Sequence, residues 1–281
     1  MSRSADIRRV LVIVPAYNEA ATVGAVVQGI ARERPGAAVL VVDDGSTDGS
    51  GALSAEAGAE VLTLPFNTGY GPALQTGIKY ALRRGFAAAV VCDGDGQHDP
   101  GSIGALLAEF ERSGADIVVG SRYLETGTFE APALKRAAVR FFGLLAGACI
   151  GQRVTDPTSG FKALGRRAMR YYVSDLLPIS FPDADAMITA HRVGLRIVEV
   201  PVKMHPRAEG RSMHDGLKGF VYFFNMLFSI LVTVMRKDRL DPEVTDDDPR
   251  DAAKAEGVRG VRGAAVPPAD IRPGAAPPAQ D

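Results

Sequence analysis

The chain has 281 residues, a formal net charge of −1 and 46% hydrophobic residues. This length and apolar content are enough for a buried core in one domain, and they exclude a fibrous or largely disordered protein. A sequence pI of about 6.4 indicates no broad positive surface, so nucleic acid is excluded as the expected partner. The first apolar run is only about five residues long and ends at Pro15, which predicts a strand and not a signal peptide.

Short β-branched runs alternate with segments of helical periodicity in the first half of the chain. This alternation is typical of a parallel sheet with helices on its faces, so the predicted fold class is α/β. The predicted strands are residues 10–14, 38–42, 60–63, 87–92 and 116–119. Asp99 and Pro100 are predicted to begin one intervening helix, and Gly85 to end another.

The second half of the chain is less regular, and its sequence predicts helices over residues 132–150 and 183–193 and a strand over residues 195–202. Cys92 and Cys149 lie in apolar segments without metal-ligand spacing. We therefore predict that both cysteines are reduced core residues.

Residues 219–235 form an uncharged apolar run. As a helix the run would be about 26 Å long, slightly short of a bilayer core of about 30 Å. Asn225, Ser229 and Thr233 recur every four residues and would form a polar stripe. This stripe favours a helix that lies in a membrane interface or packs on a partner, with a membrane span and a buried core helix as the alternatives.

An acidic motif, DGDGQHD, follows the fourth predicted strand. In an extended segment Asp93 and Asp95 project to the same side, and Gly94 and Gly96 let a ligand approach the backbone. Two carboxylates so close repel each other unless a cation binds them. Oxygen ligands predict Mg²⁺ or Mn²⁺, and so few protein ligands leave coordination positions for phosphate oxygens. The alternative is a solvated acidic loop.

A second acidic motif, DDGSTDGS, follows the second predicted strand. The carboxylates of Asp43 and Asp44 could accept hydrogen bonds from a base or from ribose hydroxyls, or the loop could simply cap the next helix. Because parallel strands end at the same edge of a sheet, both motifs should lie on one rim. The stretch NTGYGPALQTG holds an incomplete glycine motif and no Walker lysine motif occurs, which argues against dinucleotide oxidoreductases and P-loop phosphotransferases.

Seven motifs between residues 8 and 215 together resemble the family 2 glycosyltransferases with a GT-A fold, and most closely the dolichol-phosphate mannose synthase subgroup. In chain order they are VPAYNEAATVGAVV, VVDDGSTDGS, NTGYGPALQTG, DGDGQHDP, IVVGSRY, DPTSGFKALGRRA and RIVEVPV followed by R..G.S. The resemblance implies a mixed, mostly parallel sheet flanked by helices. We expect a catalytic domain over residues 1–215, an apolar membrane-interface helix over residues 216–237 and a disordered Pro/Gly/Ala-rich tail over residues 238–281.

The resemblance also implies a nucleotide-sugar donor and the residues that bind it. The implied nucleotide-sugar pocket comprises Pro15, Tyr17, Glu19, Val42, Asp43, Asp44, Asp93, Gly94, Asp95 and Arg207. The implied metal ligands are Asp93, Asp95 and Gln97. Met213 stands where the subgroup has a lysine, so the donor stays open between the GDP-mannose and UDP-glucose types.

The acceptor that the resemblance implies is a polyprenyl phosphate. Its phosphate would be bound by Arg122, Arg136 and Arg140. An ionised phosphate needs no protein base, whereas a sugar hydroxyl does. Asp183 and Asp185 stand where many members keep an acid, and they either act as that base or begin a helix with favourable charge. The candidate catalytic residues are Asp93, Asp95, Arg122 and Asp183.

The resemblance therefore implies a metal-dependent, inverting transferase, which we expect to be peripheral at the cytoplasmic face of the membrane. Its expected partners are the membrane surface or a small membrane protein, with residues 219–235 as the candidate anchor. One alternative is a transferase with a soluble or glycan hydroxyl acceptor. The other is a catalytically silent nucleotide-binding scaffold, which the intact Asp93, Asp95 and Gln97 disfavour.

Overall fold

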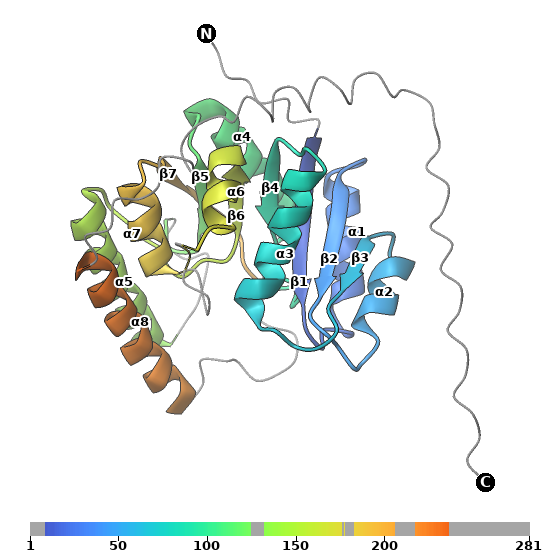
Figure 1. The fold of residues 1–281 in the computed structure, drawn as a ribbon, viewed down its shortest axis with the longest axis horizontal. Coiled ribbons are helices and arrows are strands. Elements are labelled where there is room, and N and C mark those ends of the chain that lie inside the picture. The colour runs from blue at the N-terminus through green and yellow to red at the C-terminus, as the bar shows by residue number, and fades with distance from the viewer. Residues whose placement is uncertain (1–8, 125–131, 176, 178–182, 206–216, 236–281) are drawn as a thin grey trace. The chain divides into compact units, whose positions relative to one another are not determined.

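The computed structural model of the protein describes residues 9–124, 132–175, 177, 183–205 and 217–235 (Figure 1). All of these residues lie in the first of the two compact units into which the chain divides, residues 1–247. The predicted tail after residue 238 and the candidate ligand Arg207 lie outside the described residues.

Seven strands form one sheet in the order β3-β2-β1-β4-β6-β5-β7. They are β1 (Val10–Ala16), β2 (Ala38–Asp43), β3 (Glu60–Thr63), β4 (Ala88–Val91), β5 (Ile117–Ser121), β6 (Lys162–Gly165) and β7 (Ile197–Pro201). Strand β6 is antiparallel to both of its neighbours, and the other pairings are parallel. The predicted mixed, mostly parallel sheet is confirmed, although β6 was not predicted as a strand.

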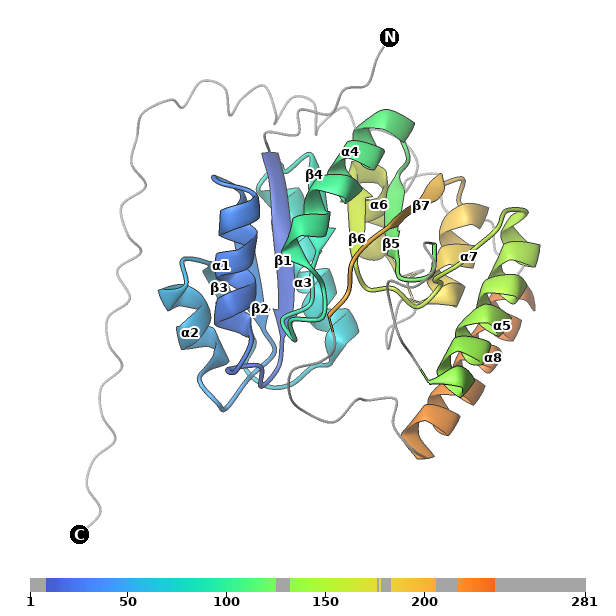
Figure 2. The same cartoon turned by 180° about the vertical axis from the view of Figure 1, so that it is seen from behind.

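Helices cover both faces of the sheet and create two hydrophobic cores (Figures 1 and 2). On one face lie α1 (Val23–Glu33), α2 (Ser50–Glu56) and α4 (Ile103–Ser113), with a 3₁₀ turn η2 (Pro100–Ser102) before α4. On the opposite face lie α3 (Tyr70–Arg83), α5 (Ala133–Ile150), α6 (Arg166–Tyr172), α7 (Ala184–Arg192) and α8 (Leu217–Met235).

Strand β1 is buried along its whole length because helices lie on both of its faces. Leu11 and Ile13 belong to the core under α3, whereas Val12 and the other even-numbered residues of β1 belong to the core under α1. A Cβ atom at Gly77 of α3 would lie 2.5 Å from Ile13 Cγ2, so the absence of a side chain lets α3 pack directly on the sheet. This packing fixes where the carboxyl end of β1 emerges.

The predicted helix boundaries are confirmed with one difference. The Asp99 side chain accepts from Gly101 N at 3.2 Å, but the first turn after it is 3₁₀ and not α-helical. Gly85 has φ of 72° and follows α3, as expected of a left-handed residue at a helix end. Cys92 is buried, but the prediction for Cys149 was wrong, because that residue lies on the exposed face of α5.

The apolar helix α8 is present, and two residues of the predicted polar stripe, Ser229 and Thr233, face the protein, whereas Asn225 is exposed. Ser229 Oγ donates to the buried carboxylate of Asp185, and Arg192 Nη1 donates to the Thr233 carbonyl, so both contacts tie α8 to α7. Met226 is buried in the same core. Within the part of the chain that the structure describes, no helix has the length and hydropathy needed to cross a membrane.

Candidate active site

The loops after β1, β2 and β4 meet at the carboxyl edge of the sheet. Gly94 N donates to Pro15 O at 3.2 Å, and Asp44 N donates to Ala16 O at 2.9 Å. Thr22 Oγ1 donates to Gly94 O at 2.8 Å. The prediction that both acidic motifs lie on one rim is therefore confirmed.

The first two loops are tied together by a residue that the sequence analysis missed. Asn18 has a φ of 53°, and its side-chain oxygen accepts from Thr47 N at 2.9 Å. Its own N–H donates to Ser46 Oγ at 3.0 Å. Asn is among the non-glycine residues that best tolerate a positive φ, so the AYNE stretch carried a hint of this turn. Beside it, Tyr17 is 46% exposed at the rim.

The acids of the β2 loop bind their own backbone. Asp44 is 3% exposed, and its carboxylate accepts from Thr68 N and Thr68 Oγ1, both at 2.7 Å, and from Gly69 N at 2.8 Å. Asp43 is 4% exposed and accepts from Ser46 N at 3.0 Å. These contacts fit the structural alternative for the motif. The predicted contact of these two acids with a nucleotide stays a prediction.

The acids of the β4 loop are more open. The Asp93 side chain is 29% exposed, and one of its oxygens accepts from Tyr70 Oη at 3.1 Å. Asp95 Oδ1 accepts from Gln97 N at 3.0 Å, which folds the loop back on itself. The loop thus presents two neighbouring carboxylates at the rim, beside Gln97.

His98 anchors this loop from the protein interior. Its side chain is 2% exposed and stacks on Phe161, with ring centroids 4.7 Å apart. Burial lowers the pKa of His98 to about 4, so the ring is neutral near pH 7. Its Nδ1 accepts from Asp93 N at 2.9 Å, which places the remaining ring proton on Nε2. Neither Tyr70 nor His98 was predicted to contact Asp93.

Gly160 approaches the acids from the loop before β6. A Cβ atom at this position would lie 3.1 Å from both Asp93 Oδ2 and Tyr70 Oη. Any side chain would therefore displace the carboxylate or the phenol. The SGF motif contains this glycine because the loop passes directly beside Asp93.

The carboxylates fit a divalent ion that shares its coordination with a ligand. Asp93 and Asp95 offer oxygen atoms only, the donor type that Mg²⁺ and Mn²⁺ prefer. Among the described residues no group of three or more His, Cys, Asp or Glu side chains could hold a metal ion. The donor set is therefore incomplete on protein acids alone. Gln97 and phosphate oxygens would complete it.

Arg122 is more enclosed than expected for a phosphate ligand. Its side chain is 10% exposed, and Nε and Nη2 each donate to the carboxylate of Asp156 at 2.7 Å. Burial alone would lower the pKa of Arg122, but the charge and hydrogen bonds of Asp156 outweigh burial and raise it. The guanidinium is thus charged and fixed in direction. Its contact with an acceptor phosphate stays a prediction.

Five further predicted residues lie in three places of the fold. Arg136 and Arg140 are exposed on α5, and the Arg136 charge opposes the rise that burial causes in the pKa of Tyr123, next to Arg122. Asp183 precedes α7 close to the acids, since its charge contributes to the raised pKa of the half-buried Tyr70, after desolvation and Asp93. Two predicted pocket residues, Pro15 and Val42, are buried within the sheet.

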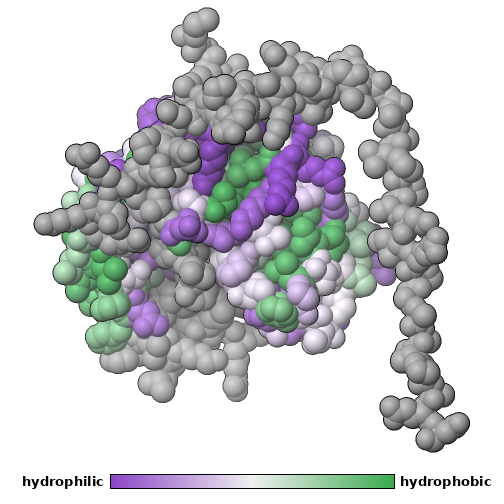
Figure 3. Space-filling view, in the orientation of Figure 1, coloured by the Kyte–Doolittle hydropathy of each residue, from purple (hydrophilic) through white to green (hydrophobic). Residues whose placement is uncertain are grey.

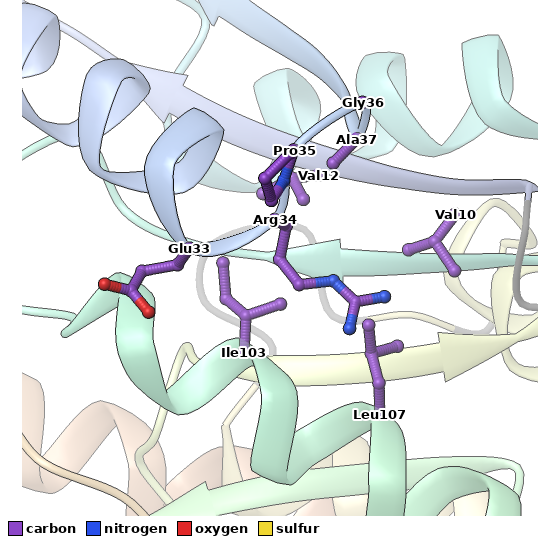
Figure 4. A pocket seen from close by; sticks show the side chains of 9 residues that line it. All are labelled: Val10, Val12, Glu33, Arg34, Pro35, Gly36, Ala37, Ile103 and Leu107. Carbon is purple, nitrogen blue, oxygen red and sulfur yellow. The ribbon is translucent and has the colours of Figure 1, made fainter.

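A separate hollow lies at the amino edge of the sheet. Its volume is about 340 Å³, and it is lined by Val10, Val12, Glu33, Arg34, Pro35, Gly36, Ala37, Ile103 and Leu107. Figure 4 shows the Arg34 side chain extending toward Leu107. None of these residues belongs to the acid cluster, so the hollow is not part of the candidate site.

Residues 11–173 match the model of Glycosyl transferase family 2, which is more than half of the chain. The chain is 32% identical over 227 residues to polyprenol monophosphomannose synthase of Mycolicibacterium smegmatis, covering 74% of this chain and 82% of that protein. It is 33% identical over 217 residues to undecaprenyl-phosphate mannosyltransferase of Micrococcus luteus, covering 74% and 88%. The protein belongs to Glycosyl transferase family 2 and is a glycosyltransferase.

The structural comparison supports the fold. Glucosyl-3-phosphoglycerate synthase from Mycobacterium tuberculosis, crystallised with Mn²⁺, UDP and phosphoglyceric acid, matches with a TM-score of 0.63 at 21% identity. The match covers 82% of this chain and 80% of that chain. The predicted family and GT-A fold are therefore confirmed.

Proposed function

We propose that this glycosyltransferase moves a hexose from a nucleotide sugar to a polyprenyl phosphate while bound peripherally to a membrane. The donor would be of the GDP-mannose or UDP-glucose type, and Mg²⁺ or Mn²⁺ would be required. Two relatives are named for transfer of mannose to polyprenol or undecaprenyl phosphate, which supports the acceptor class.

The observation that carries the lipid acceptor is the combination of charge and exposed apolar surface on α5. Arg136 and Arg140 are exposed, and the same helix exposes Leu134 at 83% and Leu144 at 77%. A polyprenyl phosphate presents a doubly charged head next to an apolar chain, so it matches this combination. A soluble sugar would not use the apolar part.

Helix α8 enlarges this surface. Phe141 of α5 and Phe223 of α8 lie with ring centroids 5.8 Å apart, so the two helices are in contact. We define the α5–α8 apolar surface by its exposed side chains Leu134, Phe141, Leu144, Phe224, Phe228 and Leu231. Figure 3 shows hydrophobic residues gathered at this edge of the molecule. Such a surface suits a helix pair that lies in the membrane interface.

The acceptor phosphate is its own nucleophile. With a second pKa near 6, a phosphate monoester is ionised at neutral pH and needs no general base. One of its oxygens would attack the anomeric carbon opposite the diphosphate, forming the new C–O bond as the bond to the nucleoside diphosphate breaks, with inversion. The bound divalent ion would neutralise charge on the departing diphosphate. Asp93 and Asp95, with Gln97, would hold that ion, while Tyr70 and His98 keep Asp93 in place.

Transfer can be measured with the purified full chain, Mn²⁺, vesicles containing polyprenyl phosphate, and radiolabelled GDP-mannose or UDP-glucose. We expect label from one donor to enter the organic phase, EDTA to abolish the transfer, and added Mn²⁺ to restore it. Label that remains in the aqueous phase with every donor would contradict the proposal.

Membrane binding has a matched control. Phe228 of α8 and Phe66 in the loop after β3 are 67% and 66% exposed. In vesicle co-sedimentation Phe228→Asp should weaken binding at least about threefold, because it removes an inserted apolar side chain, whereas Phe66→Asp should not. Equal binding by both variants would show that α8 does not face the lipid.

A hydroxyl acceptor is the second candidate, and the position of Asp183 favours it. The charge of Asp183 acts on both Tyr70 and Arg122, so it lies near the acids, whereas Asp185 is turned toward Ser229 of α8. Asp183 is therefore the better general base of the two. Asp183→Asn should change transfer to a phosphate less than about threefold but reduce transfer to a hydroxyl at least about a hundredfold.

A further inference from the structure

Glu199 in β7 anchors the loop that precedes β6. Its carboxylate accepts from Thr155 N and Asp156 N, each at 2.9 Å, and from Thr155 Oγ1 at 2.8 Å. Burial raises the pKa of Glu199, and the two backbone N–H groups oppose that rise. Because every one of these partners donates, Glu199 acts as an acceptor and fixes the start of the loop.

Asp156 passes this constraint on to Arg122. Its side chain is 0% exposed, and it receives a two-pronged contact from Nε and Nη2 of Arg122, both at 2.7 Å, together with Arg122 N at 3.0 Å. Thr158 Oγ1 accepts from the same Nη2 at 2.8 Å. A fork-to-carboxylate pair of this kind restricts the plane and the direction of the guanidinium.

The other end of the same loop lies beside the carboxylate of Asp93 in the loop after β4. Ser159 Oγ donates to Gly120 O at 2.6 Å, which fixes the loop against β5. The next residue, Gly160, is the position where a Cβ atom would lie 3.1 Å from Asp93 Oδ2. Residues 155–160 therefore join the guanidinium of Arg122 to the carboxylate of Asp93 through one short segment.

We infer that Glu199 and Asp156 are positioning residues for the acceptor phosphate: Glu199 fixes the loop, and Asp156 sets the orientation of Arg122 relative to Asp93. Neither residue need touch a substrate. This inference rests on the proposed function, because it assigns Arg122 to the acceptor side of the reaction.

Misplacing a charged group by about 1 Å can cost roughly a hundredfold in rate, so small losses of order at Arg122 should be measurable. Asp156→Asn replaces one carboxylate oxygen, which accepts a hydrogen bond from Arg122, with an NH₂ group that cannot accept it. We expect the KM for polyprenyl phosphate to rise at least tenfold, with donor binding in the presence of Mn²⁺ changed less than about twofold. Glu199→Gln, one contact further away, should raise the same KM by a smaller factor.

The matched control is Asp116→Asn. Asp116 also accepts from a guanidinium, Arg167 Nη1 at 3.0 Å, and from a backbone N–H, Arg196 N at 2.9 Å, but it has no contact with the acid cluster. It should leave the acceptor KM unchanged. If Asp116→Asn raises that KM as much as Asp156→Asn does, or if Asp156→Asn weakens donor binding equally, the inference is overturned.

A second variant pair tests whether Asp156 acts through Arg122. Arg122→Gln should raise the acceptor KM, and adding Asp156→Asn to it should change the KM less than about twofold further. Full additivity of the two effects would contradict a positioning role and indicate an independent contribution.

The orientation of Arg122 can also be followed without turnover, by the NMR resonance of its Nε–H, assigned through its loss in Arg122→Gln. Asp156→Asn and Glu199→Gln should shift or broaden this resonance, and Asp116→Asn should not. An unchanged resonance overturns the inference even if the wild-type enzyme is active. If the resonance moves but wild-type protein transfers no sugar to polyprenyl phosphate, the proposed function fails while the link from Glu199 to Arg122 stands.

Discussion

Two loops on the same rim carry adjacent acids and use them differently. In the loop after β2, Asp44 is almost fully buried and accepts three hydrogen bonds from its own chain. In the loop after β4, Asp93 is 29% exposed and is held through a phenol and through its own backbone N–H. The first pair of acids organises the rim, whereas the second is presented on it.

The two loops differ in the hydrogen-bond donors that surround their carboxylates and in the exposure of those carboxylates. Backbone N–H groups that saturate a buried carboxylate make it a structural element, because its oxygens are occupied and shielded from water. A carboxylate that stays partly exposed, as that of Asp93 does, can meet a ligand at the rim while its loop stays folded. The substitutions below test this distinction, from the largest expected effect to the smallest.

Asp95→Asn should reduce turnover about a thousandfold, since a metal-coordinating carboxylate contributes several kcal/mol of charge stabilisation in the transition state. The free energy of unfolding should change by less than about 1 kcal/mol, because the side chain is partly exposed. Steady-state kinetics with Mn²⁺ and urea unfolding measure the two effects. Retained turnover would remove Asp95 from the metal site.

Asp44→Ala should lower the free energy of unfolding by about 2–4 kcal/mol, because the N–H groups of Thr68 and Gly69 lose their acceptor in a buried site. Asp93→Ala is the comparison and should cost less than about 1 kcal/mol. Urea denaturation of both variants gives the values. Equal losses would erase the distinction between the two loops.

Tyr70→Phe should reduce turnover about three- to tenfold, because it removes one hydrogen bond of roughly 1 kcal/mol to Asp93. Tyr80→Phe is the matched control on the same helix, since Tyr80 Oη donates to Glu60 away from the site. The control should keep wild-type kinetics. Identical kinetics for both variants would show that the phenol of Tyr70 does not help to hold Asp93.

Asp185→Asn should have the smallest effect, less than about 1 kcal/mol of unfolding free energy at neutral pH. Burial raises the pKa of Asp185 above its ordinary value, so its contribution favours the folded state below that ordinary value and is lost as pH rises through the folded-state pKa. The wild type should therefore lose stability relative to the variant as the pH rises above about 4, the ordinary pKa of an aspartate. Urea unfolding of both proteins at a series of pH values from about 4 upward measures this, and a constant difference would contradict the shift.

Local sequence patterns predicted the elements of the first half and the shared rim, because the alternation of β-branched runs with helical segments can be recognised from residues that are close in the sequence. Strand β6 was missed, since its sequence KALG has no β-branched residue and it pairs antiparallel with strands distant in sequence. The acids Asp93 and Asp95 stood out because both lie in one motif.

The residues that position the site side chains are distant from them in the sequence, so no local sequence pattern predicts the contacts. Each of these contacts joins residues that are far apart in the sequence. Most of α3 lies between Tyr70 and Asp93, α5 lies between Arg122 and Asp156, and α6 and α7 lie between Thr155 and Glu199. The sequence therefore predicted which residues carry charge, but not that Arg122 would be enclosed by Asp156. That outcome depends on the burial of both partners, which only the folded chain determines.

The way α8 packs on α7 bears on how the exposed apolar side chains of α8 could be removed from the protein. The side of α8 that carries Ser229 covers Asp185, while Phe224 and Phe228 face outward. Deleting the helix would therefore expose Asp185 and the core side chains beneath α8 to water. Replacing Phe224 and Phe228 with polar residues would leave that core covered. To reduce the exposed apolar surface, substitution of the outward-facing side chains of this helix is therefore preferable to deletion of the helix.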